Sequence, residues 1–361
     1  LKGTSADERA RRVSNTASGQ TSRSEYLYWS AYQPKDVRMT ARFIHLRLHS
    51  EYSLTDSTVR IDELVKACVK RGMPALALTD DSNVFALLKF FKAAYSAGLQ
   101  PIAGADLWVQ DGEDAARLTL LCANREGYRN LCILISRAYS EGRQLDRPIL
   151  QRDWLTGHTQ GLVALSGGMQ GEIGQLLLSG REDTANLQLR RWMRLFPDAF
   201  YLELSRCGRP QEDLLTLATA QLAQSANCPA VVTNDVRFID REDFEAHEAR
   251  VAIAQGYTLG DSRRPRDYSP EQYLKSPAEM AELFADLPEA LSNTVDLARR
   301  LNLSLQTGTY FLPEVPTREG ETAGARLARE AREGLELRLT KLETAKAMAR
   351  PRQDYLDRVD L

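Results

Sequence analysis

Short apolar runs alternate with longer amphipathic stretches along most of this chain. The first two runs, residues 43–48 and 75–78, are mostly apolar and have the length of buried β-strands. Between them, the apolar positions of residues 58–71 recur every three or four residues, which is the spacing of an amphipathic helix. Gly72 and Pro74 then end this helix. The pattern therefore opens with a strand, a helix and a second strand.

The same alternation continues for about seven repeats. It predicts parallel strands that are joined by crossover helices, either in a closed barrel or in an open doubly wound sheet. Further strands are predicted at residues 101–109, 117–122, 161–165, 200–204 and 230–233. Further helices are predicted at residues 84–97, 128–139, 172–178, 184–195, 212–226 and 241–254.

The positions of the polar residues favour the barrel. Most of them lie at or just past the carboxyl ends of predicted strands, which share one face in a barrel but spread along a crevice in an open sheet. These residues are His49, Asp80, Asp81, Asp106, Ser166 and Asp235.

The two ends of the chain have a different character. Residues 1–38 are rich in Ser, Thr, Arg and Gly without an apolar period, so we expect a disordered tail or a misassigned start. The aromatic run at residues 26–32 is either an interaction motif or has no role in the fold. Residues 287–301 and 321–341 have helical patterns separated by a Pro-punctuated connector. The final residues resemble the beginning of a helix, which suggests the front part of a longer protein.

Composition narrows the class of protein. Of the 361 residues, 43% are hydrophobic and 27% are charged, which is typical of a globular protein with a core. The net charge of −2 gives no overall footprint for nucleic acid. No apolar run is long enough to span a membrane, and the five cysteines form no CxxC pair. We therefore expect a cytoplasmic protein with reduced thiols and no membrane partner.

The strand-end residues have two possible roles. Carboxylates and imidazole suit Mn²⁺, Mg²⁺ or Zn²⁺, and such an ion can activate water. Alternatively, the same residues cap strands and loops through hydrogen bonds. The candidates are His49, Asp56, Asp80, Asp81, Asp106 and Asp235.

Several sequence blocks occur in the order typical of one family. They are HLRLHSEYSLTD at residues 45–56 and the blocks at residues 75–109, 118–131, 162–174 and 231–247. Together they resemble the polymerase and histidinol phosphatase (PHP) domain of the alpha subunits of bacterial DNA polymerase III. The resemblance implies a distorted seven-stranded parallel β/α barrel over residues 39–304. Residues 305–361 then resemble a connector and the beginning of the polymerase palm.

Metal-binding members of this family carry nine ligands, and the resemblance places each ligand on one position of this chain. A ligand is kept at three positions, which are His49, Asp56 and Asp235. It is replaced by aspartate at two, Asp81 and Asp106. It is lost at four, which are Arg47, Arg117, Gly168 and Arg237.

Three of the four lost ligands are replaced by arginine. Arginine is a poor metal ligand because it stays charged. We therefore expect Arg47, Arg117 and Arg237 to form ion pairs with the neighbouring carboxylates in place of metal ions. The centre is then vestigial, without a cofactor or catalysis of its own. Any weak metal binding is expected at His49, Asp56 and Asp235.

The resemblance also implies partners and a role. The full protein would synthesise DNA with Mg²⁺ in a palm outside this segment. It would contact DNA and the other holoenzyme subunits. The segment itself would be a scaffold that docks the proofreading 3′–5′ exonuclease subunit. The alternatives are an active metal-dependent phosphoesterase, either a pyrophosphatase or a 3′-exonuclease, and an error-prone paralogue of the alpha subunit. The basic run at residues 263–266 could contact phosphate or form a solvated loop.

Overall fold

The chain divides into two units: the first ends at Leu305 and the second begins at Gln306. The computed structural model describes residues 42–112, 114–144, 147–306, 308 and 312–359. The predicted tail at residues 1–38, with its aromatic run, lies outside the described residues. No helix in the described part of the chain is long and apolar enough to cross a membrane.

One mixed sheet of eight strands forms the centre of the first unit. Parallel pairing joins β1 to β2, β2 to β5, β6 to β7 and β7 to β8, which confirms the predicted α/β class. The strands are β1 (Ala75–Leu78), β2 (Gln100–Gln110), β3 (Ala115–Cys122), β4 (Arg143–Gln144), β5 (Arg147–Gln151), β6 (Leu162–Leu165), β7 (Phe200–Ser205) and β8 (Ala230–Thr233).

Strand β3 departs from the predicted all-parallel order. It runs antiparallel to both β2 and β6. The connection from β2 spans only residues 111–114, which suffices for a hairpin but not for a crossover helix. The reversal places the beginning of β3, with Arg117, beside the carboxyl ends of the parallel strands.

Residues 43–49 close the sheet. On one side, the backbone N–H groups of Ala77 and Thr79 donate to the carbonyls of His45 and Leu48, both at 2.9 Å. On the other side, the N–H of His49 donates to the carbonyl of Val236 at 3.0 Å, just past β8. This segment and strands β1, β2, β3, β6, β7 and β8 therefore form a closed barrel.

The strand count differs from the predicted seven for two reasons. The short strands β4 and β5 form an additional hairpin at the edge of β2. Residues 43–48 form one regular bridge, at Leu48, because their alternation is interrupted. Ile44 and Leu46 belong to the inner apolar cluster, whereas Leu48 packs in the outer cluster. The interruption lets Arg47 and His49 share the inside of the barrel.

The inside of the barrel is apolar at one end and polar at the other. Ala77, Leu121 and Val163 point inward with Val295 and Leu297 of α11, whereas their strand neighbours pack outward against the surrounding helices. Helix α11 contacts the beginning of β2 as well, because the Gln100 side chain donates to the carbonyls of Ala298 and Leu301. The amino end of the barrel is thereby filled, and the charged residues are confined to the opposite end.

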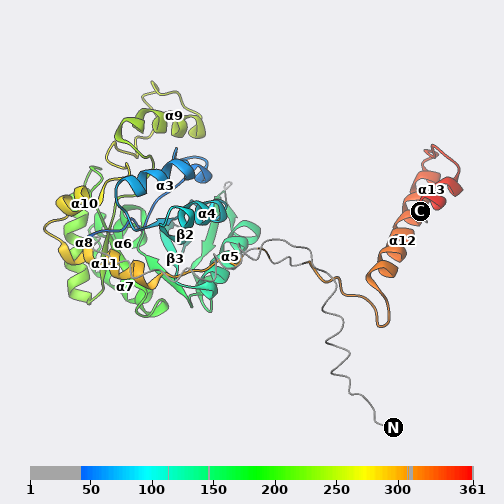
Figure 1. Cartoon of the computed structure of the whole chain (residues 1–361), viewed down its shortest axis with the longest axis horizontal. Helices are drawn as coiled ribbons and strands as arrows, with labels where there is room; N and C mark the ends of the chain where they lie inside the picture. Colours follow the sequence, from blue (N-terminus) through cyan, green and yellow to red (C-terminus); the bar gives the residue numbers. More distant parts are fainter. Residues whose placement is uncertain (1–41, 113, 145–146, 307, 309–311, 360–361) are drawn as a thin grey trace, which may run out of the picture. The chain divides into compact units, whose positions relative to one another are not determined.

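Most of the helices of this unit pack around the barrel, whereas α11 fills its amino end and α9 lies beyond α3 (Figure 1). The helices are α3 (Ile61–Lys70), α4 (Leu87–Ser96), α5 (Arg125–Glu141), α6 (Glu172–Leu178), α7 (Glu182–Leu195), α8 (Glu212–Ala226), α9 (Phe244–Gln255), α10 (Pro277–Leu283) and α11 (Pro288–Arg300). The predicted helix at residues 241–254 is divided, since the 3-10 turn η4 (Arg241–Asp243) precedes α9. The second unit contains α12 (Ala323–Thr344) and α13 (Arg352–Val359).

Candidate functional site

The nine predicted ligand positions lie close together at the carboxyl end of the barrel. They come from residues 43–49 and the following loop, from strands β2 and β3, and from the segments after β1, β6 and β8, and all except Asp81 are buried. They are Arg47 and His49 from residues 43–49, Asp56 from the next loop, Asp81 after β1, Asp106 on β2, Arg117 on β3, Gly168 after β6, and Asp235 and Arg237 after β8.

Arg47 pairs with Asp106 in the middle of the site. Its Nη2 and Nε donate to Asp106 Oδ2 at 2.7 and 3.2 Å. Its Nε also lies 3.4 Å from Asp235, and its Nη1 lies 3.6 Å from Glu203. Burial alone would raise the pKa of Asp106, but Arg47 and Arg117 hold that pKa well below its usual range. Asp106 therefore remains a carboxylate that these cations neutralise.

Arg237 bridges two further carboxylates. Its Nη1 lies 2.6 Å from Asp56 Oδ2, and its Nη2 lies 2.6 Å from Asp235 Oδ1. Burial opposes ionisation of both acids, but Arg237 lowers the pKa of each below its usual value. These are short, charge-assisted hydrogen bonds between groups that are almost completely withdrawn from water.

Arg117 forms a two-pronged pair with Asp81. Nη1 and Nη2 donate to the two carboxylate oxygens at 2.7 and 2.9 Å. The guanidinium carbon also lies 4.1 Å from the ring centroid of Trp108. Planar stacking combined with a bidentate carboxylate fixes the orientation of this side chain, and lysine could not reproduce it.

His49 lies between two of these carboxylates. Its Nδ1 is 3.0 Å from Asp56 Oδ1, and its Nε2 is 3.2 Å from Asp106 Oδ2. Burial and Arg237 both lower its pKa, but Asp56 and Asp106 outweigh them and raise the pKa above its usual value. Nδ1 also contacts Arg237 Nη1. Both ring nitrogens are therefore engaged within the protein.

The position of the lost cysteine-type ligand faces Arg47. A Cβ built on Gly168 would lie 3.8 Å from Arg47 Nη1. The preceding Gly167 has a φ of +78°, and a Cβ there would lie 2.2 Å from the Arg117 carbonyl. Only glycine fits at residue 167, because the turn after β6 brings its backbone against both Arg47 and Arg117. Ser166, Gly167 and Gly168 thus form a tight connection in this site.

Comparison with known proteins shows what this chain is similar to. Residues 45–207 match the PHP domain family. DNA polymerase III subunit alpha of Pseudomonas aeruginosa is 51% identical over 328 residues, which cover 89% of this chain and 28% of that protein. The chain is a homologue of the DNA polymerase III alpha subunit. The corresponding subunit of Escherichia coli K12 is 48% identical over 319 residues, covering 87% of this chain and 27% of that protein.

This alpha-subunit homologue spans about 28% of the length of the first relative. Among solved structures, an amidohydrolase from Chromobacterium violaceum is 14% identical with a TM-score of 0.38. That match covers 61% of this chain and 99% of the other. The likeness is too weak to support an inference about the site.

The residues of this site do not fit a cluster of divalent ions. Within the described ranges, no group of three or more His, Cys, Asp or Glu side chains is arranged to hold a metal. Instead, Arg47, Arg117 and Arg237 lie directly against the carboxylates. A guanidinium is a hydrogen-bond donor only, so none of the three can coordinate a cation.

We call Arg47, Arg117 and Arg237, together with the carboxylates that they contact, the arginine network. One predicted candidate, Asp80, is not among those carboxylates. Asp80 accepts hydrogen bonds from the backbone N–H of Ser50 at 2.6 Å and from the hydroxyls of Ser50 and Ser53 at 2.9 and 2.8 Å. Burial raises its pKa in spite of these donors. Asp80 therefore anchors the loop after residue 49, which is the capping role considered as the alternative.

Sequence reasoning missed Glu203, whose carboxylate lies 3.6 Å from Nη1 of Arg47. Its carboxylate accepts the N–H of Gly167 at 2.6 Å and the hydroxyl of Thr233 at 2.9 Å. Burial raises its pKa, although Arg47 opposes that rise. The available signal was a charged residue at an inward position of the otherwise apolar strand β7.

Arg209 was missed as well. Its guanidinium lies 3.3 Å from Asp235 and 3.0 Å from Glu212, and it is largely buried. The local sequence Cys-Gly-Arg-Pro is typical of a solvated turn, so no pattern pointed to a buried cation here. A fourth arginine therefore extends the network along the β7–α8 connection.

Proposed function

We propose that residues 39–304 act as a non-catalytic PHP scaffold within a DNA polymerase III alpha subunit. The observation that carries this proposal is the presence of arginine at three ligand positions, each in contact with a buried or partly buried carboxylate. A fixed guanidinium supplies the positive charge that such carboxylates need, but it cannot activate water for phosphoester hydrolysis. The segment therefore needs no cofactor.

We infer a role for the whole protein from its relatives. Alpha-subunit homology supports DNA-directed DNA synthesis by the full-length protein, with Mg²⁺ bound in a palm outside this segment. Residues 305–361 would begin that palm. The PHP unit would dock the proofreading exonuclease subunit, and DNA would be contacted through the full-length protein.

The experiment measures metal content and hydrolysis on the same preparation. The chain is dialysed against buffer with and without a chelator, its Zn and Mn are measured by mass spectrometry, and hydrolysis of a phosphodiester is followed with added Mn²⁺. We expect substoichiometric metal and no hydrolysis. The matched variant carries Arg47→His, Arg117→His and Arg237→His, which restores the lost ligand type and should increase metal retention.

One alternative retains structural support. His49 still contacts both Asp56 and Asp106, so part of a coordinating set remains in place. An active phosphoesterase would retain stoichiometric metal and lose turnover in Asp235→Ala. That result would overturn the scaffold proposal, whereas weak binding of one ion without turnover would leave the domain non-catalytic.

A further inference from the structure

Leu54 has a backbone conformation that residues other than glycine rarely adopt. Its φ is 63° and its ψ is −45°, and the N–H of Thr55 donates to the carbonyl of Ser53 at 2.7 Å across it. These are the features of a γ-turn with a positive φ, which is rare and strained. Such a conformation persists only where neighbouring contacts impose it. The turn lies two residues before Asp56, so it helps to position that member of the arginine network.

The contacts that impose this turn come from two sides. The Leu54 side chain is 67% exposed, so the restraint acts on the backbone. On the barrel side, the Ser53 hydroxyl donates to Asp80 at 2.8 Å. On the other side, Arg250 of α9 donates to the carbonyls of Leu54 and Glu51 at 2.9 and 3.2 Å. Helix α9 therefore holds the strained residue directly.

Helix α9 and the segment that follows it also hold Asp56. His247 of α9 donates through Nε2 to the backbone carbonyl of Asp56 at 3.0 Å. The hydroxyl of Tyr268 donates to Asp56 Oδ2 at 3.4 Å, and its ring packs edge to face against His247 with centroids 4.7 Å apart. The same carboxylate oxygen lies 2.6 Å from Arg237. Contacts from outside the barrel thus support the pairing of Asp56 with Arg237.

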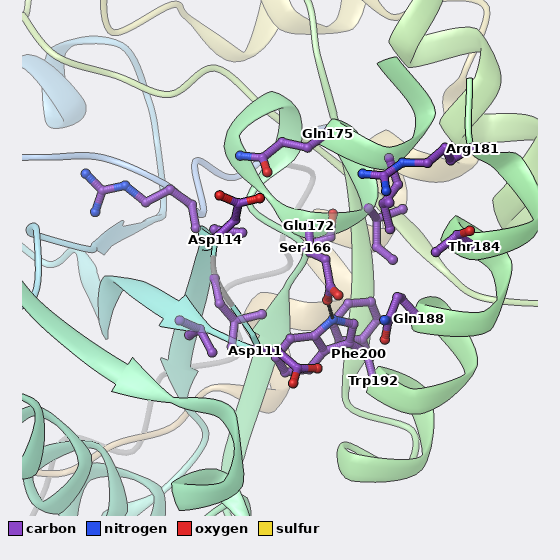
Figure 2. A pocket seen from close by; sticks show the side chains of 16 residues that line it. Asp111, Asp114, Ser166, Glu172, Gln175, Arg181, Thr184, Gln188, Trp192 and Phe200 are labelled. Carbon is purple, nitrogen blue, oxygen red and sulfur yellow. Dashed lines mark hydrogen bonds between the residues drawn. The ribbon is translucent and has the colours of Figure 1, made fainter. Parts of the chain in front are cut away.

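Helix α9 buries few apolar side chains. Among its buried residues only Val251 and Ala252 are apolar, and Ile253 is 79% exposed. Helix α7 is attached differently, since Figure 2 shows Trp192 beside Phe200 of β7, and the two rings stack with centroids 5.9 Å apart. Segments with little buried apolar surface open at a smaller free-energy cost than the core. We therefore expect α9 to separate from the barrel more readily than α7.

The segment after α9 returns to the barrel close to the point where the chain left it. The N–H of Arg237 donates to the carbonyl of Gln272 at 2.9 Å, and the N–H of Leu274 donates to the carbonyl of Phe238 at 3.0 Å. The two ends of residues 239–271 therefore lie side by side, and Figure 1 shows α9 beyond α3. A segment with adjacent ends can open as one cooperative unit without breaking the pairing at its base.

One buried ion pair joins the returning segment to α9. Nη1 of Arg264 lies 2.6 Å from Oε2 of Glu248, and the two residues are 5% and 6% exposed. Among the described residues, Nε of Arg264 and Oε1 of Glu248 have no hydrogen-bond partner. Buried charges with incomplete hydrogen bonding regain solvation when they separate. The pair therefore fixes the geometry of the closed form and adds little to its stability.

We propose that α9 and residues 256–268 form a clamp that opens as one unit while the barrel stays folded, and that its opening releases the γ-turn at Leu54 and withdraws Asp56 from Arg237. In the closed form, Arg237 bridges Asp56 and Asp235. In the open form, it keeps Asp235 alone, and Asp56 returns to water. The arginine network then has two states, and any molecule that binds one of them better shifts the balance. This inference does not depend on the proposed scaffold role.

The test follows amide hydrogen exchange in the whole chain by mass spectrometry. In the unmodified chain, we expect α9 and residues 51–59 to exchange faster than β7 and β8, because local opening costs less than global unfolding. Arg264→Met leaves Glu248 buried without a counter-charge, so exchange in both segments should rise by about tenfold or more. Arg264→Met/Glu248→Met removes both charges and should return exchange towards that of the unmodified chain.

Leu54→Gly changes the balance in the opposite direction. Glycine adopts a positive φ without strain, so the closed form is favoured, and exchange should slow by about threefold or more in both segments. The change in α9 is the informative one, since the helix itself is unmodified. Leu312→Gly, at an 86% exposed leucine of the second unit, and Arg299→Met, at a 54% exposed arginine of α11, are controls and should leave both segments unchanged.

Several results would overturn the proposal. Exchange in α9 that is no faster than in β8, or a rise in Arg264→Met that reaches β7 and β8 equally, would show that the clamp does not open separately. Unchanged exchange in Arg264→Met, or a rise confined to α9, would show that residues 51–59 do not follow the clamp. Unchanged or faster exchange in Leu54→Gly would show that the turn stores no strain, and this variant decides the matter if Arg264→Met does not fold. Linked changes in α9 and residues 51–59, opposite in sign in the two variants and absent from β7 and β8, support the proposal.

Discussion

Removing Arg237 tests whether the arginines neutralise the buried carboxylates. The substitution Arg237→Met keeps a long side chain but removes the cation that lies 2.6 Å from both Asp56 and Asp235. Both acids are almost completely buried, so neither can regain the solvation that it lost on folding. We expect the variant to be strongly destabilised at neutral pH.

The magnitude follows from the burial of the pair. Removing one partner of a buried ion pair costs about 3–5 kcal/mol, because the other charge is left uncompensated. A domain has a total unfolding free energy of about 5–15 kcal/mol, so the variant should remain folded only narrowly. Arg209 and His49 also contact the orphaned acids, which keeps the expected cost within this range.

The dependence on pH gives a second readout. In the unmodified protein the folded pKa values of Asp56 and Asp235 are depressed, so their contribution to stability is complete above the unfolded pKa and is lost as pH falls below about 4. Without Arg237, burial raises these pKa values, and protonation relieves the unpaired charge. The difference between the two proteins should therefore shrink between pH 7 and pH 5, by at most about 1.4 kcal/mol per pH unit for each acid.

Urea unfolding followed by circular dichroism measures both quantities. Arg263→Met is the control, because Arg263 also pairs with an aspartate, Asp261, but is 81% exposed. Its stability should equal that of the unmodified chain within error. A cost below about 1 kcal/mol for Arg237→Met at pH 7, or a cost that does not change with pH, would refute the reasoning.

Three further predictions concern buried histidines, the Asp235–Arg237 pair and the turn at Gly167. Burial lowers the pKa of His45 and His247 to about 4, so the unfolded state binds more protons than the folded state between pH 6.5 and 4. As the pH falls to 5, each histidine should therefore lower the free energy of unfolding by about 2 kcal/mol, measured by urea unfolding. His247→Gln should make this free energy depend less on pH. Asp235→Asn combined with Arg237→Met should cost less than the sum of the single variants, since the double variant lacks both charges, and additive costs would contradict coupling. Gly167→Ala should destabilise the domain by at least about 1 kcal/mol in thermal unfolding because its Cβ would overlap the Arg117 carbonyl, whereas Gly180→Ala is a control with a positive φ and no nearby atom.

Much of the fold could be predicted from the sequence because most elements carry a clear period. Helix α8 has the predicted bounds, and β1 and β8 do as well. The orientation of β3 could not be predicted from its own residues, because parallel and antiparallel strands have the same alternation. The length of the connection at residues 111–114 was the only local sign of the reversal.

The candidate site was partly predictable for a different reason. Family resemblance places nine positions on the chain, and the fold brings those positions together. The pairing of Arg117 with Asp81 and of Arg237 with two acids depends on side-chain directions that a sequence does not contain. Glu203 and Arg209 joined the network without any family signal, since each is fixed by what surrounds it in space.

The proposed exchange of metal ions for guanidinium groups would change what the centre can do. A bound ion can be exchanged, accepts ligands in several directions and polarises water. An arginine is covalently attached, donates only in the plane of its guanidinium and keeps its charge at every accessible pH. In the proposed scaffold, the barrel end would keep the charge balance of a metal site and lose its Lewis acidity. Because Arg47 lies against β2, Glu203 and the turn after β6, that balance is built into the packing and cannot be removed by a chelator.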